Sequence, residues 1–313
     1  MTLVLFQMDP LNKINKSTDS TYLLAVESIK IGFNAMYCNP NNVSIDSKDL
    51  VVEASQLRLK NNELEIKKNT KKKIAISKFD VVLIRQDPPF NMNYITNTYL
   101  LNTEKNKRKP FYINDPQGIR NFSEKIFPLF FKDYIPDTSI TASKEVINNF
   151  LVKHKKIVVK PLYEKGGNGV FVLEYKSKNK NTIISKQTKK FSSPIILQKY
   201  LPLIIKGDKR ILLINGNPVG AVNRVPLKGS FIANLHLGSH AKKTHLTKRE
   251  IKICSELKPF LKKNGLFFVG IDVIGGQLTE INVTSPTGIK QINELNQTKI
   301  ETLFWKEVLK RTI

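Results

Sequence analysis

The stretch from Ile271 to Gly288 reads IDVIGGQLTEINVTSPTG, in which two apolar segments flank a Gly-Gly pair and carry Asp272, Glu280 and Asn282. Isolated carboxylates are costly to bury, and the usual compensations are a cationic partner, a metal ion or protonation. Two carboxylates and an amide offer only oxygen ligands, which suits Mg²⁺ held between a protein and substrate phosphates. We therefore predict a β-hairpin with a magnesium site, the alternative being a surface hairpin with solvated acids.

The length of the turn decides whether these side chains can meet. A two-residue loop at the Gly-Gly pair would pair Asp272 with Thr279 and leave Glu280 on the opposite face, because side chains alternate along a strand. A three-residue loop over Gly275 to Gln277, with a glycine in a bulge, would place Asp272 opposite Glu280, with Asn282 on the same face. We predict the three-residue loop.

Length and composition bound the class of protein. A chain of 313 residues is expected to form two or three domains, and 25% charged residues is typical of a globular protein. The sequence holds no run of about 18 apolar residues, so no membrane-spanning helix is expected. The N-terminus lacks a basic leader, and Cys38 and Cys254 are too few for a disulfide framework. These features predict a cytoplasmic protein.

The formal net charge of +25 invites a nucleic-acid interpretation, because clustered Lys and Arg displace counterions from phosphate backbones. Only eight of the 51 basic residues are Arg, however, and the Lys residues are spread along the chain. The basic runs 67–73 and 176–190 are predicted to be solvated hairpins or loops. We predict no specific nucleic-acid partner and keep a basic nucleic-acid binder as an alternative.

The first third of the chain alternates strand and helix patterns, which predicts a parallel sheet. The expected elements are a strand 3–8, a helix 20–31 capped by Thr18-Asp19, a strand 79–84, a helix 94–105 and a strand 111–114. Ligands of such sheets bind beyond the carboxyl ends of the strands, where Asp9, Arg85 and Asn114 fall. We predict that Arg85 binds an anion, the alternative being an ion pair with Asp87.

After about Ser123 the pattern changes to short antiparallel strands with two helices, which suggests a separate small domain. Lys125 begins this domain, and Lys160 precedes a loop with three glycines that can lay backbone N–H groups over phosphates. The order of these residues is not that of a P-loop, and an ordinary glycine turn is the alternative. Leu201-Pro202 is predicted to be a hinge, with backbone groups near Lys199 and Leu201 free to pair with an adenine edge.

The last third begins with a strand that leads into Asn215-Gly216, a pair typical of hairpin turns, and the returning strand carries Arg224. The loop 227–241 has few helix or strand signals. Loops of this length in a compact enzyme are commonly lids, so we predict that this loop closes over an active site.

These segments together resemble those of bacterial glutathione synthetases in the ATP-grasp superfamily, and the resemblance covers nearly the whole chain. It is carried by Met8-Asp9-Pro10, Arg85 to Phe90, Glu124-Lys125, Lys160-Pro161, Gln198 to Pro202, Gly207 to Arg210, Phe268 to Asp272 and Thr279 to Thr287. The lysines and metal-binding residues are shared by ATP-grasp ligases in general. The strings DPPF and EINVTSPT are similar to glutathione synthetases specifically.

The resemblance implies an architecture that combines α/β and α+β parts in an ATP-grasp fold. An N-terminal parallel α/β domain (the pre-ATP-grasp domain) would span residues 1–122 and bind substrate. A small central lid domain would span residues 123–201, and a C-terminal α+β catalytic domain would span residues 202–313. The resemblance also suggests a homo-oligomer, specifically a homotetramer.

The implied reaction is the ATP-dependent ligation of γ-glutamylcysteine with glycine through an acyl phosphate, giving glutathione, ADP and phosphate. The residues that would bind ATP are Lys125, Lys160, Gly166, Gly167, Gln198, Lys199, Tyr200, Leu201 and Asp208. Asp272, Glu280 and Asn282 would hold Mg²⁺, with Mn²⁺ as an alternative ion. Arg210 and Asn234 would be catalytic, and the two substrates would be bound by Arg85, Asn114, Arg224, Ser285, Pro286 and Thr287.

The chain departs from the family pattern in the lid loop, which is also poorer in glycine, and at Asp115, where a lysine is frequent. Bacterial glutathione synthetases usually carry an arginine two residues before the Asn of the lid loop, whereas this chain has Ile232 there. The alternatives to the implied function are another ATP-grasp ligase, of the D-alanine or glutamate type, and a non-catalytic ATP-binding protein.

Overall fold

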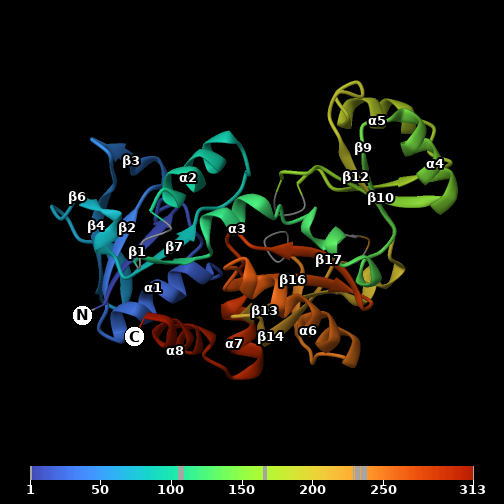
Figure 1. Cartoon of the computed structure of the whole chain (residues 1–313). Coiled ribbons are helices and arrows are strands. Elements are labelled where there is room, and N and C mark those ends of the chain that lie inside the picture. Colours follow the sequence, from blue (N-terminus) through green and yellow to red (C-terminus); the bar gives the residue numbers. More distant parts are fainter. Residues whose placement is uncertain are drawn as a thin grey trace.

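The computed structural model describes residues 2–104, 109–164, 168–227, 229, 233 and 238–312, which form three sheets with helices packed against them (Figure 1). Short 3₁₀ turns occur at residues 40–42, 76–78, 127–130, 132–134 and 202–206. No helix among the described residues is long and apolar enough to cross a membrane.

The N-terminal sheet has a parallel half and an antiparallel half. The parallel strands are β1 (Leu3–Met8), β2 (Asn34–Cys38), β7 (Val81–Arg85) and β8 (Phe111–Ile113). The long strand β4 (Asp49–Lys60) pairs antiparallel with β2 and with the edge strands β3 (Val43–Asp46), β5 (Glu63–Ile66) and β6 (Lys72–Ala75). The parallel sheet was predicted, and the first strand has the predicted bounds.

Local sequence explains the helices of this part. Asp19 caps α1 (Ser20–Lys30) by accepting a hydrogen bond from the backbone N–H of Tyr22, and the chain leaves the helix through Gly32 at a φ of +87°. Asn91 caps α2 (Met92–Asn102), so this helix begins and ends earlier than predicted. Asp115 caps the short α3 (Pro116–Asn121).

The central sheet is antiparallel, as predicted, and has the order β11-β10-β12-β9. Its elements are β9 (Thr138–Thr141), α4 (Lys144–His154), β10 (Lys156–Lys160), β11 (Phe171–Glu174), α5 (Lys180–Gln187) and β12 (Ile195–Lys199). Both helices pack on the sheet through a small apolar core of its own. The prediction that 176–190 forms a loop is wrong, because α5 lies within it and buries Ile184 in this core.

The C-terminal sheet has the order β15-β14-β13-β16-β17 and carries α6 (Lys248–Lys263) on one face. Its strands are β13 (Asp208–Ile214), β14 (Asn217–Val225), β15 (His240–Lys243), β16 (Phe268–Ile274) and β17 (Gln277–Asn282). Asn215 and Gly216 form the two-residue turn between β13 and β14 with φ of +51° and +75°, as predicted for an Asn-Gly hairpin.

The chain ends by returning to its beginning. After α7 (Ile289–Asn296), helix α8 (Ile300–Thr312) lies beside α1, and the two termini are close together (Figure 1). The Trp305 indole N–H donates to the Leu24 carbonyl of α1 at 2.9 Å. One buried cluster runs from Val4 and Phe6 of β1 to Phe268 of β16 and to Trp305. The N-terminal and C-terminal sheets therefore share a hydrophobic core.

Candidate active site

The register of the C-terminal sheet gathers polar side chains on one face. Arg210 on β13 lies opposite Asp272 on β16, and Asp208 on β13 lies opposite Arg224 on β14. Cross-strand partners share a face, and α6 covers the other face of this sheet. The polar residues therefore point away from α6.

The β16–β17 hairpin pairs Asp272 with Glu280, as predicted, but through a different turn. Gly275 and Gly276 alone form the loop, with φ of +56° and +78°, and Gln277 already belongs to the β17 ladder. Two successive positive φ values are those of the primed turns that match the twist of a hairpin, and glycine adopts them without strain. The predicted three-residue loop is therefore wrong.

A β-bulge further along the hairpin restores the pairing. Leu278 faces Val273 and Glu280 faces Asp272, which leaves Thr279 as the extra residue. The Thr279 hydroxyl donates to the backbone carbonyl of Asp272 at 3.1 Å. The bulge shifts the register by one residue, which compensates for the shorter turn and puts both carboxylates on the same face.

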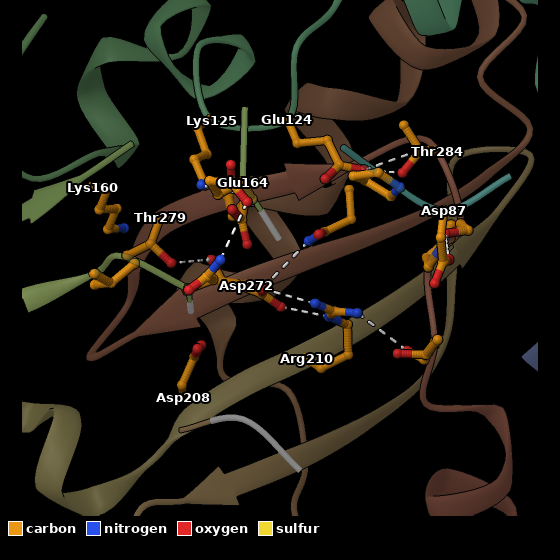
Figure 2. Close-up of a pocket in the computed structure, with 18 of the residues that line it drawn as sticks. Asp87, Glu124, Lys125, Lys160, Glu164, Asp208, Arg210, Asp272, Thr279 and Thr284 are labelled. Carbon is orange, nitrogen blue, oxygen red and sulfur yellow. Dashed lines mark hydrogen bonds and ion pairs between the residues drawn. The ribbon is translucent and has the colours of Figure 1, made fainter. Parts of the chain in front are cut away.

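A pocket of about 990 Å³ lies over this face and is lined by residues of the central and C-terminal sheets and by loop residues of the N-terminal part (Figure 2). Its wall includes most of the residues for which the sequence predicted a role: Lys125, Lys160, Gln198, Lys199, Tyr200, Leu201, Asp208, Arg210, Arg224, Asp272, Glu280, Asn282, Ser285, Pro286 and Thr287. The fold thus brings residues more than 160 positions apart in the sequence to one cavity.

Two arginines hold the carboxylate of Asp272. Arg210 donates from Nε to Oδ1 at 2.5 Å and from Nη2 to Oδ2 at 2.9 Å, and Arg224 Nη2 lies 2.9 Å from Oδ1. Burial alone would raise the pKa of Asp272, but the two guanidinium groups together hold that pKa well below its ordinary value. The Asn282 amide adds a hydrogen bond to Oδ2 at 3.3 Å. Asp272 therefore stays ionised.

The pKa of Asp208 is shifted in the opposite direction to that of Asp272. Its Oδ2 lies 2.6 Å from Arg224 Nη2, whereas its Oδ1 is buried and accepts no hydrogen bond within the part of the chain that the structure describes. Burial, only partly offset by Arg224, raises the pKa of Asp208 to about 7. This carboxyl can therefore gain or lose a proton near neutral pH.

Two lysines bring positive charge to the other side of the pocket. Lys125 Nζ donates to the carbonyls of Pro161 and Glu164 at 2.8 and 2.5 Å, and burial lowers the pKa of this ammonium group. Lys160, at the end of β10, donates to Gln198 Oε1 on the neighbouring β12 at 2.9 Å. Both cations face the carboxylates of the C-terminal sheet across the pocket (Figure 2).

The segment after β12 does not have all the free backbone donors that the sequence predicted. The N–H of Lys199 donates to the Asp137 carbonyl at 2.8 Å, and the N–H of Tyr200 donates to the Lys156 carbonyl at 3.3 Å. Both groups take part in the antiparallel ladder or its continuation. The prediction of free groups is therefore wrong for these two donors.

Arg85 and Asn114, predicted to bind substrate, are not on the pocket wall. Arg85 is 4% exposed and donates to Thr21 Oγ1 and to the Pro286 carbonyl, both at 2.9 Å. Asn114 is 2% exposed, and its amide bonds three backbone groups of Phe268 and Val283. In this structure each side chain instead joins the N-terminal part to the C-terminal sheet, and direct substrate contact by either residue stays a prediction.

Several predicted residues fall outside the described part of the chain. These are Gly166 and Gly167 of the glycine loop, Asn234, and the divergent Ile232. Within the predicted lid loop, Ala233 is described; it is buried and lines the pocket.

Two acidic residues of the pocket wall had no role predicted from the sequence. Glu124 and Glu164 line the pocket together with Lys125 and Lys160. Glu124 is next to a lysine that was singled out, and this adjacency was the available signal. Glu164 precedes the glycines of the loop and had no comparable signal.

The oxygen-rich side of the pocket suits a hard divalent cation. Within the described ranges, no group of three or more His, Cys, Asp or Glu side chains could hold a metal ion unaided. Asp272, Glu280 and Asn282 instead supply two carboxylates and an amide beside the lysines. This set fits Mg²⁺ that takes its remaining ligands from phosphates and water.

Family models match almost the entire chain. The model for the N-terminal domain of prokaryotic glutathione synthetase matches residues 2–120, and the model for the ATP-grasp domain of prokaryotic glutathione synthetase matches residues 124–297. The chain belongs to the prokaryotic glutathione synthetase family. The first match ends at residue 120 and the second begins at Glu124, which lines the pocket.

Relatives agree with this membership over nearly their whole length. The chain is 41% identical to the glutathione synthetase of Brucella melitensis over 308 residues, with 97% of each chain covered. It is 39% identical to the glutathione synthetase of Mesorhizobium japonicum over 303 residues, with 96% of each covered. The chain is therefore an ATP-dependent peptide ligase.

Solved structures of lower identity share the fold. The D-cycloserine synthetase DcsG has a TM-score of 0.70 at 13% identity, covering 99% of this chain and 100% of that one. D-alanyl-alanine synthetase A of Vibrio cholerae has a TM-score of 0.58 at 14% identity, covering 99% and 98%. The predicted ATP-grasp fold is confirmed.

Proposed function

We propose that this chain joins γ-glutamylcysteine to glycine at the expense of ATP, giving glutathione, ADP and phosphate. The terminal phosphoryl group of ATP passes to the cysteinyl carboxylate, which gives an acyl phosphate. The glycine amine then attacks the acyl carbon, the C–O bond to phosphate breaks, and the amine loses a proton. The product contains a new amide bond.

The observation that carries this proposal is the arrangement of charge in the pocket. Lys125 and Lys160 line one side, and Arg210, Asp272 and Glu280 line the other, within one cavity of about 990 Å³. Cations are needed because ATP and the substrate carboxylate repel each other. Carboxylates are needed because a metal ion has to be held against the phosphates.

The two lysines and Arg210 have different parts in the reaction. Lys125 and Lys160 neutralise the α- and β-phosphates of ATP, so that the nucleotide is fixed in the cavity. Arg210 stabilises the phosphoryl group in transit and then the tetrahedral oxyanion that forms when the amine attacks. Its guanidinium is already oriented by two hydrogen bonds to Asp272, so little reorganisation is needed.

Asp272, Glu280 and Asn282 would hold Mg²⁺ or Mn²⁺, and the ion would offset negative charge on the phosphates of ATP. Asp272 and Glu280 lie directly opposite each other across β16 and β17, and Asn282 follows on the same face. The raised pKa of Asp208 and the lowered pKa of Asp272 show that one face carries carboxyl groups of different proton affinity.

Substrate recognition falls to the segment after β17. Ser285, Pro286 and Thr287 line the pocket and supply polar backbone groups for the peptide. Arg224 lines the pocket beside them, and its guanidinium meets substrate carboxylate while it also pairs with Asp208. The predicted lid loop 227–241, whose last two residues belong to β15, would on closing keep water from hydrolysing the acyl phosphate.

The test is phosphate release from ATP and Mg²⁺ by the purified protein. Release should require γ-glutamylcysteine and glycine together, and each substrate alone or a D-alanine or glutamate pair should give only background. The matched loss-of-function variant is Glu280→Gln, which removes one negative charge from the pocket wall and should lower release by at least about 100-fold. Release with a D-alanine or glutamate pair instead would move the assignment to another ligase, and no release with any pair would favour a non-catalytic nucleotide binder.

The remaining predictions concern assembly and surroundings. We propose a homotetramer, a cytoplasmic location, no specific nucleic-acid partner, and functional parts that divide near residues 122 and 201. Light scattering coupled to size exclusion measures the mass of the assembly, and a mass of one or two chains would contradict the tetramer. Nucleic-acid binding that is tight, sensitive to salt and independent of nucleotide would contradict the absence of such a partner.

A further inference from the structure

The segment 283–287, which leads away from β17, is held by residues far from it in the sequence. Its residues Thr284 to Thr287 line the pocket. The residues that hold it come from the end of β7 and from position 124, at the entry to the central part. These residues are 159 to 201 positions away from their partners.

An anion holds the beginning of this segment. Glu124 Oε1 accepts hydrogen bonds from the backbone N–H groups of Val283 and Thr284, both at 3.1 Å, and from the Thr284 hydroxyl at 2.6 Å. The backbone carbonyl of Glu124 also accepts from the N–H of Ile281 at 3.0 Å. Figure 2 shows the carboxylate directed at Thr284. One residue therefore fixes the backbone on both sides of Asn282.

A cation and a second carboxylate hold the end of the segment. Arg85 Nη2 donates to the Pro286 carbonyl at 2.9 Å, and the Ser285 hydroxyl donates to Asp87. The negative carboxylate of Glu124 thus accepts from backbone N–H groups, and the positive guanidinium of Arg85 donates to a backbone carbonyl. This is the polarity in which charge-assisted hydrogen bonds are strongest.

The last residue of the segment, Thr287, contacts the guanidinium of Arg210. Arg210 Nη1 donates to the Thr287 carbonyl at 3.2 Å. A displacement of the segment would move this carbonyl, the pocket-lining side chains of Ser285 and Thr287, and Asn282 at once. Lys125, next to Glu124 in the chain, would move with it.

We infer that Glu124 is a positioning residue of the ligase reaction, which acts through the segment 283–287 and keeps the peptide pocket and Arg210 in register, with Arg85 as its oppositely charged counterpart. This inference rests on the proposed function for its kinetic readout. Glu124 lines the pocket, and the three hydrogen bonds that its Oε1 accepts all come from the beginning of the segment 283–287. Its effect on the reaction is therefore indirect.

The decisive variant is Glu124→Gln, which keeps the size of the side chain but replaces one carboxylate oxygen and the charge by an amide. We expect kcat to fall by about 10- to 100-fold and the KM for γ-glutamylcysteine to rise, while the KM for ATP changes by less than about threefold. Thr284→Val removes only one of the three donors and should lower kcat by no more than about threefold. Glu256→Gln, at an exposed position of α6, is the matched control for charge and should match the unaltered protein.

A second readout does not depend on activity. Hydrogen exchange of the amides of Val283 and Thr284 should be faster in Glu124→Gln than in the Glu256→Gln control, with protection in β9–β12 unchanged. If the unaltered protein shows no ligase activity, the proposed function fails, while this exchange result still tests the hold on the segment. Unchanged kcat and KM in a folded Glu124→Gln protein, or unchanged exchange at both amides, would overturn the inference.

Discussion

Asp272 and Glu280 face each other across two strands, yet their surroundings differ. Asp272 is 3% exposed and accepts from two guanidinium groups, whereas the Glu280 carboxylate makes no hydrogen bond or ion pair with any residue that the structure describes. Loss of charge at Asp272 leaves Arg210 and Arg224 without their shared anion. Loss of charge at Glu280 leaves no partner unpaired.

The two positions should therefore separate catalysis from stability. Asp272→Asn should abolish phosphate release and lower the free energy of unfolding by about 3 kcal/mol, because it breaks a buried ion pair. Glu280→Gln should lower phosphate release by at least about 100-fold but change the free energy of unfolding by less than about 0.5 kcal/mol. Urea unfolding and phosphate release measure these effects, and equal destabilisation by both variants would contradict the distinction.

The raised pKa of Asp208 predicts a dependence of stability on pH. Its folded-state pKa of about 7 lies above the ordinary value of 3.8, so the folded protein binds this proton more tightly than the unfolded chain. Asp208 therefore makes stability fall as pH rises from roughly 4 to 7, by up to about 1.4 kcal/mol per pH unit. Urea unfolding of the protein without nucleotide, compared with Asp208→Asn at pH 5, 6, 7 and 8, measures this effect. The difference between the two curves should level off above pH 7, and parallel curves would refute the assignment.

Residue types and the resemblance to the family together identified most polar residues of the pocket wall but not the contacts of Arg85 and Asn114. A charged or amide side chain after a parallel strand is a sound candidate for ligand binding. In this fold the carboxyl ends of β7 and β8 are covered by the C-terminal part, so both side chains bond its backbone instead. These hydrogen bonds join residues that are 154 to 201 positions apart in the sequence. A local sequence pattern does not indicate such contacts.

At the scale of an element, the β16–β17 hairpin shows which features of a hairpin a strand pattern predicts and which it does not. The alternation of apolar residues and the need for paired carboxylates predicted that Asp272 faces Glu280, which is confirmed. The extra residue of the hairpin was predicted to lie in the turn, whereas it lies in strand β17 at Thr279. A turn and a bulge can exchange one residue without changing the pairing beyond them, so the sequence alone did not distinguish the two.

This arrangement predicts that changes in the turn affect stability but not catalysis. Gly276 has a φ of +78°, and a Cβ there would lie 2.9 Å from the Arg249 side chain. Gly276→Ala should lower the free energy of unfolding by about 1–2 kcal/mol because alanine is strained at positive φ. Gly276→Asn adds the same Cβ but tolerates this backbone conformation, so it should be less destabilising.

Both variants should keep kcat within about twofold, because they leave unchanged the length of the turn and the bulge at Thr279, which together set the register at Glu280. Urea unfolding and phosphate release test the pair together. Loss of activity in either folded variant would mean that the backbone conformation of the turn also controls the register at Glu280.

At the scale of the whole molecule, the first and last parts of the chain are one structural unit. Trp305 of α8 is 1% exposed and packs edge-on against Phe6 of β1 and Phe33, while its N–H bonds Leu24. The central sheet has a separate core that includes Leu151. The sequence predicted three successive domains but not that α8 closes the N-terminal core, because an amphipathic helix does not reveal which sheet it covers.

This shared core predicts a specific pattern of local unfolding. Trp305→Ala should lower stability by about 3–5 kcal/mol and reduce hydrogen-exchange protection in α1, some 280 residues away in the chain, as well as in α7. Protection in β9–β12 should not change, because that core makes none of these contacts among the residues described. The matched variant Leu151→Ala should do the reverse and expose β9–β12 while α1 stays protected. If Trp305→Ala left α1 protected, the two large sheets would be stabilised independently, and the segment 283–287 would need another explanation for its fixed position beside Arg85.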